Sequence, residues 1–146
     1  MTWQELLAEG RVERHRTSKQ ELTALRSAIE RNHRDAGVAQ LSADNRFGLA
    51  YEAALLTAKM ALACAGYRVK GPGAHQTTFA ALKLALGPEI AKTAVYFERC
   101  RRKRNELSYD TAGVATDTEA SEILFEARAF HDMVERWIAQ SHPNLV

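Results

Sequence analysis

The sequence predicts an all-α protein, built as an up-and-down bundle of four long helices with an additional short helix at the N-terminus. Long stretches rich in Ala, Leu, Glu and Arg, all strong helix formers, lie between few prolines and glycines. Apolar residues within these stretches recur every three or four positions, and no alternating pattern typical of strands stands out. A chain of 146 residues fits one domain, residues 1–146, with a sizeable core.

The first three expected helices cover residues 3–14, 19–35 and 43–65. Each follows a side chain that can accept hydrogen bonds from the first turn, namely Thr2, Ser18 and Ser42. The third helix is apolar around most of its circumference, so we expect it to lie at the centre of the bundle.

Three further helical stretches are expected at residues 76–86, 89–107 and 117–140. Gly87 and Pro88 separate the first two, and a loop with Gly113 precedes the last, for which Asp117 or Thr118 is the expected N-cap. The two tryptophans, Trp3 and Trp137, predict that the first helix packs on the last.

Several classes of protein are excluded by composition. Cys64 and Cys100 stand alone in helical patterns, which argues against a disulfide framework and favours a reducing cytoplasm. No apolar run approaches the roughly 20 residues of a membrane span, and the N-terminus does not resemble a signal peptide. The histidines are scattered, so we expect no metal site, and the segment 71–73 lacks the remainder of a phosphate-binding loop, so we expect no cofactor.

The net charge of +2 conceals one dense cluster of positive charge. Five of six consecutive residues are basic: Arg99, Arg101, Arg102, Lys103 and Arg104. On a helix, Arg101, Asn105 and Tyr109 share one stripe. Guanidinium groups bind phosphate through two parallel hydrogen bonds, so this stripe is a candidate phosphate site. Arg46 and His75 are candidates to join it from other helices.

A plainer interpretation of the same cluster stays open. Basic residues near a helix C-terminus stabilise the helix dipole, and charge runs are usually solvated faces. Closely spaced like charges repel one another, however, and this repulsion favours the approach of an anionic partner.

The segment Arg104-Asn105-Glu106-Leu107-Ser108-Tyr109 resembles the motif of HEPN domains, in which four to six residues separate an Arg, often followed by Asn, from a His. Residues 45–56 resemble the helix that small HEPN proteins place before a glycine-containing loop and a histidine, with residues 63–68 and 73–75 as the continuation. The resemblance extends over about residues 42–110.

HEPN proteins of this kind pair with nucleotidyltransferases or act as metal-independent ribonucleases in toxin–antitoxin systems, and the active ones are homodimers with a shared RNA cleft. The resemblance therefore implies catalytic positions at Arg104, Asn105 and Tyr109. A tyrosine has an ordinary pKa near 10, against about 6.5 for histidine, so Tyr109 is a poor general base.

Three functions follow as hypotheses. The favoured one is a non-catalytic or weakly catalytic module that presents the basic stripe to RNA or to a phosphorylated or nucleotidyltransferase partner. The second is a toxin-type ribonuclease, and the third is a structural bundle with a solvated basic patch. Candidate phosphate-binding residues are Arg99, Arg101, Arg102, Lys103, Arg46 and His75.

Overall fold

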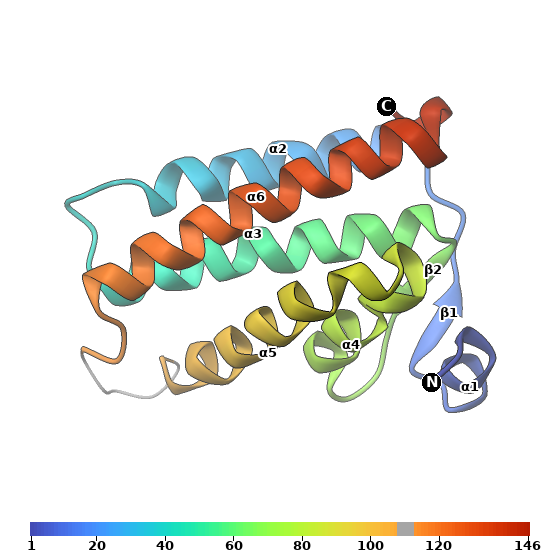
Figure 1. The fold of residues 1–146 in the computed structure, drawn as a ribbon, viewed down its shortest axis with the longest axis horizontal. Helices are drawn as coiled ribbons and strands as arrows, with labels where there is room; N and C mark the ends of the chain where they lie inside the picture. The colour runs from blue at the N-terminus through green and yellow to red at the C-terminus, as the bar shows by residue number, and fades with distance from the viewer. Residues whose placement is uncertain (108–112) are drawn as a thin grey trace.

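A computed structural model describes residues 1–107 and 113–146 and confirms the all-α class (Figure 1). The elements, in chain order, are α1 (Trp3–Ala8), β1 (Val12–Arg14), α2 (Lys19–Ala36), α3 (Ala43–Cys64), β2 (Tyr67–Val69), α4 (Ala74–Leu86), α5 (Ala91–Glu106) and α6 (Asp117–Ser141). Short 3-10 turns at Pro88–Ile90 and Pro143–Leu145 precede α5 and follow α6.

Helix α3 is the centre of the molecule, as its composition predicts. It packs along α2 and α6 on one side and against α4 and α5 on the other (Figure 1). More than half of its 22 residues are buried. By length and composition α3 could also cross a membrane, but 72% of its most apolar window is buried inside the protein. Its apolar character is therefore accounted for by its central position in the core.

The helices around α3 contribute one apolar stripe each. In α6 the stripe includes Ile123, Phe130 and Ile138, all fully buried. Phe97 of α5 packs between Phe79 of α4 and Phe130, with ring centroids 5.9 and 5.4 Å away. These three rings join the two sides of the bundle in one core.

The N-terminal region differs from the sequence prediction. The first helix ends at Ala8 rather than continuing to Arg14, since Gly10 takes a left-handed conformation with φ of 69°. Residues 12–14 instead form β1, which pairs antiparallel with β2 in the register Val12↔Val69. Strands of three residues are too short to show an alternating pattern, which is why the sequence gives no sign of them.

The expected contact between the first and last helices is wrong. Trp3 stacks on Tyr67 of β2, with ring centroids 3.9 Å apart, whereas Trp137 packs its ring edge against His142. Helix α1 covers a small separate core of Leu6, Val12, Leu62 and Ala81.

The start of α6 also differs from expectation. Thr116, rather than Asp117 or Thr118, is the N-cap, and its hydroxyl accepts a hydrogen bond from the Glu119 amide at 3.0 Å. The Glu119 carboxylate accepts from the Thr116 amide in return, which completes a capping box.

Candidate nucleic-acid interface

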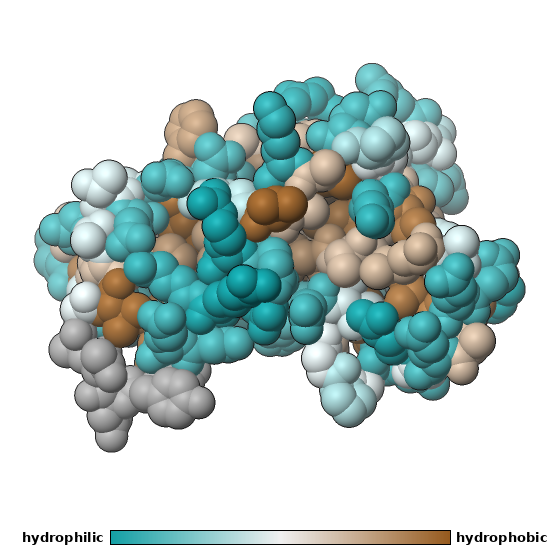
Figure 2. Space-filling model, turned by 60° about the horizontal axis from the view of Figure 1, so that its bottom comes forward, coloured by the Kyte–Doolittle hydropathy of each residue, from teal (hydrophilic) through white to brown (hydrophobic). Residues whose placement is uncertain are grey.

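The predicted basic cluster lies on the second half of α5, a helix with little apolar surface. Among the described side chains of α5, only Phe97 and Cys100 are buried. Lys103 and Arg104 occupy its last turn, where positive charge stabilises the helix dipole. Viewed from the side that carries α5, the middle of the surface is mainly hydrophilic (Figure 2).

Two arginines of the cluster and the neighbouring asparagine are exposed, and we call Arg99, Arg102 and Asn105 the exposed α5 face. The guanidinium of Arg99 lies 5.6 Å from the centroid of the Tyr96 ring, in a cation–π arrangement. The Arg102 side chain is 72% exposed, and its Nε is 3.7 Å from a Glu98 oxygen. These groups present donors to solvent on the last turns of the helix.

Three of the other predicted cations are held by carboxylates. Arg101 donates from Nε and Nη2 to Glu98, with a shortest distance of 2.7 Å. Lys103 pairs at 2.9 Å with Glu119 of α6. Arg46 pairs with Asp117 and donates to the Leu41 carbonyl, so it ties α3 to α6, and it lines a surface pocket with residues of α6 rather than of α5.

Arg101 and Arg104 are less exposed than Arg102, and their charges act on groups of α3 and α4. The Arg104 side chain lies against Gly48 of α3. A Cβ atom added to Gly48 would lie 3.4 Å from Nε of Arg104. Tyr51, one turn further along α3, is 1% exposed, and its hydroxyl has no hydrogen-bond partner among the described residues. Burial raises the pKa of Tyr51, so its hydroxyl stays neutral.

The imidazole of His75 joins this group from the first turn of α4. Its ring centroid is 6.3 Å from that of Tyr51, and the residue is exposed to solvent. Burial of part of the ring lowers the pKa of His75, and the positive charges of Lys59, Arg101 and Arg104 lower it further. An accessible imidazole that is neutral near pH 7 therefore lies within the field of two guanidinium groups.

Tyr109, the third predicted catalytic position, lies outside the described residues, but the chain that follows is well anchored. The Asp44 carboxylate, in the first turn of α3, accepts hydrogen bonds from the amides of Gly113 and Ala115 at 3.0 and 2.7 Å. The segment after residue 112 is thus held at the N-terminal end of α3.

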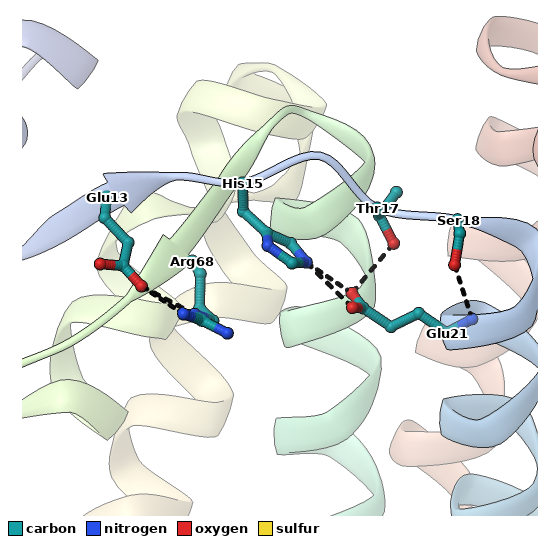
Figure 3. Close-up of polar contacts among 6 residues, drawn as sticks. All are labelled: Glu13, His15, Thr17, Ser18, Glu21 and Arg68. Carbon is teal, nitrogen blue, oxygen red and sulfur yellow. Dashed lines mark hydrogen bonds and ion pairs between the residues drawn. The ribbon is translucent and has the colours of Figure 1, made fainter.

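A second polar group, which the sequence does not reveal, lies beside the two strands (Figure 3). His15 Nε2 is 2.8 Å from the Glu21 carboxylate, which also accepts a hydrogen bond from Thr17. This contact with His15 is the main reason why the pKa of Glu21 is lowered. On the adjacent strands, Arg68 pairs with Glu13.

This group borders a pocket of about 370 Å³ between α2, α3, α4 and β2. Its polar lining consists of His15, Glu21, Lys59, Arg68, His75 and Thr78. His75 therefore lies both on this pocket and near the basic end of α5. The irregular spacing of the lining residues along the chain does not predict the pocket, because α2, β2 and α4 come together only in the folded protein.

A helical bundle with Arg-Asn at the end of its fifth helix and a histidine at the start of its fourth has the features of the HEPN class. The chain belongs to that superfamily: the model of the SAV_6107-like HEPN family matches residues 37–135, more than half of the chain. The match confirms the resemblance seen in the sequence and extends it into α6. No curated protein and no solved structure shows significant similarity to the chain.

Proposed function

We propose that this HEPN domain is a non-catalytic or weakly catalytic module that binds RNA phosphates through the exposed α5 face. The observation that carries the proposal is the division of the basic cluster. Arg101 and Lys103 pair closely with carboxylates, whereas Arg99 and Arg102 are exposed beside Asn105, and Arg102 makes only a 3.7 Å ion pair with Glu98. Ion pairs within the fold therefore account for part of the basic cluster, and the cations of the exposed α5 face remain accessible to a ligand.

Phosphate binding suits these side chains physically. Each guanidinium offers a planar pair of donors to phosphate oxygens, and each bound phosphate releases counterions from the nucleic acid. If the protein is a homodimer, as the HEPN resemblance implies, two such faces act on one strand. A monomer in light scattering at micromolar concentration would remove this part of the proposal.

The decisive experiment measures binding of fluorescent single-stranded RNA at two salt concentrations. We expect Arg99→Ala/Arg102→Ala to weaken binding by about tenfold or more. The slope of log affinity against log salt should fall by about 0.7 for each phosphate that the variant no longer neutralises. The matched control is Arg31→Ala/Arg136→Ala, which removes the same charge from exposed positions on α2 and α6.

Two results contradict the proposal. Equally weakened binding in both double variants would mean that net charge alone attracts RNA. Absence of binding at about 50 mM salt would leave a structural bundle with a solvated basic patch, because phosphate binding is strongest at low salt.

The position of His75 favours one alternative, a metal-independent ribonuclease. A neutral imidazole near Arg101 and Arg104 supplies the base that Tyr109 lacks, able to take the proton of a ribose 2′-hydroxyl as it attacks the adjacent phosphate. Cleavage of RNA in excess EDTA that is lost in His75→Gln and kept in His142→Gln would support this alternative. Binding without cleavage would support the module.

A nucleotidyltransferase partner is a further expectation from the resemblance. The exposed α5 face could meet a phosphorylated protein as well as RNA, because the phosphate chemistry is shared. Co-purification with a nucleotidyltransferase that is lost in Arg99→Ala/Arg102→Ala, in the absence of RNA binding, would redirect the proposal to that partner.

A further inference from the structure

A separate group of titratable side chains lies between α2 and α6, on the opposite side of α3 from α4. His33 and His131 are 4% and 8% exposed, with ring centroids 5.7 Å apart. Nε2 of His33 has no hydrogen-bond partner among the residues that the structure describes, whereas Nε2 of His131, which also makes no hydrogen bond there, lies beside the carboxylate of Glu135. Buried polar atoms normally have partners, so the unsatisfied imidazole nitrogen of His33, next to a second buried imidazole, calls for an explanation.

The carboxylate of Glu30 completes this group. Glu30 precedes His33 by three residues, which places both side chains on one face of α2. One oxygen of Glu30 is 3.7 Å from Nδ1 of His131. One ligand atom from each of Glu30, His33 and His131 can be chosen so that all three lie within 4.8 Å of one another.

These separations are close to those of a metal site. Ligand atoms about 2.0–2.1 Å from a tetrahedral zinc ion are roughly 3.4 Å apart, so a pair of ligand atoms at the 4.8 Å limit must approach by about 1.4 Å. Glu30 is 66% exposed, so its carboxylate can move toward the two imidazoles, which are buried.

A further carboxylate supports His131 from the other side of its ring. Nε2 of His131 lies 3.3 Å from a Glu135 oxygen, and Glu135 is fixed by two hydrogen bonds from Arg26 at 2.8 and 2.9 Å. Metal-bound histidines commonly donate their second nitrogen to such a carboxylate, which orients the ring and raises its basicity.

We propose that Glu30, His33 and His131 form a binding site for a divalent first-row transition metal, with zinc as the best-suited ion, and that Glu135 positions His131. Imidazole and carboxylate ligands suit zinc and its neighbours, whereas calcium and magnesium prefer sites made of oxygen alone. The bound ion joins α2 to α6. From the sequence we expect no metal site, although the Glu-x-x-His spacing of Glu30 and His33 is a signal that would point to one.

The test is a calorimetric titration of the full-length protein, without an affinity tag and previously treated with EDTA, with zinc chloride. We expect one ion per chain and a rise in melting temperature that grows with zinc concentration, because the ion binds the folded state. Glu30→Gln and His33→Gln should each weaken zinc binding by about tenfold or more. Glu122→Gln, an exposed carboxylate of α6, and His142→Gln are the controls and should bind as the native protein does.

The outcomes decide the proposal in either direction. No zinc binding tighter than about 100 μM, or equally weakened binding in the controls, would overturn it. Should His33→Gln fail to fold, Glu30→Gln decides, since Glu30 is largely exposed and its amide keeps the shape of the side chain. Retention of full zinc affinity in Glu30→Gln would also overturn the assigned ligand set.

Discussion

Helix α5 and most of helix α6 lie in the segment that the family model matches, yet the two helices differ in how much of their surface is buried. Helix α6 buries a continuous stripe from Ala120 to Ile138 against α3 and α2. Helix α5, within the described residues, buries only Phe97 and Cys100 and fills its second half with charge. The side chains of α6 are therefore determined mainly by core packing, whereas α5 contacts the core at fewer positions.

The difference shows which positions of this fold can change without disturbing the core. A substitution in the stripe of α6 changes the core, so these positions are constrained by volume. Ala94 and Tyr96 of α5 are partly buried against the core, whereas Arg99 and Arg102 are exposed, so packing does not require arginine at these two positions. The dense positive charge of α5 therefore has a cause outside the core, and RNA binding is the cause that we propose.

The largest effect is expected where α5 is anchored. Phe97→Ala removes a fully buried ring that packs against Phe79 and Phe130, and should lower the free energy of unfolding by about 3–5 kcal/mol. Urea denaturation measures this decrease. The control is Val95→Ala on the same helix, 62% exposed, for which we expect a change within about 0.5 kcal/mol. Equal destabilisation would mean that α5 is held along its whole length.

The next largest effect is a loss of stability at acidic pH, caused by His33 at the contact between α2 and α6. Burial, followed by the charge of His131 and Arg128, lowers the pKa of His33 from 6.5 to about 4, against the opposing charges of Glu30 and Asp132. The unfolded chain therefore binds a proton at His33 before the folded chain does. Stability should fall by about 2–3 kcal/mol between pH 6.5 and 4.

Urea denaturation at pH 7 and pH 4.5, with EDTA present, measures this dependence. In His33→Gln the side chain cannot take up a proton, so the difference between the two pH values should shrink. An unchanged difference would assign the pH dependence to other groups.

The sequence predicts the α6 side of this comparison better than the α5 side. The stripe of α6 and the apolar circumference of α3 are local patterns, and burial follows from them directly. The basic cluster of α5 is equally visible in the sequence, but the sequence does not show which of its cations pair with carboxylates and which stay exposed. Lys103 pairs with Glu119, a residue on a different helix, and only the folded chain decides which cations remain exposed.

The same limit applies to the groups that the sequence does not bring together. His33 and His131 are distant in the chain and meet because α2 and α6 lie side by side. The pairing of β1 with β2 likewise joins residues 12–14 to residues 67–69, and no pattern within three-residue strands predicts it. Local periodicity predicts elements, whereas polar sites depend on how those elements meet.

A smaller effect is expected at the start of α6, where packing alone does not hold the helix. Thr116→Ala removes the hydroxyl that caps the Glu119 amide and should cost about 1 kcal/mol of stability. Thr118→Ala, an exposed position inside the first turn, is the control and should change stability by much less. If the two variants are equal, the capping box contributes nothing beyond helix propensity.

The smallest effect on stability is expected on the exposed α5 face itself. Arg102 is 72% exposed, and its nearest carboxylate, Glu98, is already bound by Arg101, so Arg102→Ala should change the free energy of unfolding by less than about 0.5 kcal/mol. Removal of one charge from a crowded cluster also relieves repulsion, which offsets the weak ion pair. Unchanged stability together with weakened RNA binding would separate the role of α5 in recognition from its role in the fold. A destabilisation as large as that of Phe97→Ala would instead place Arg102 among the groups that attach α5 to the core, and the division between the two helices would no longer hold.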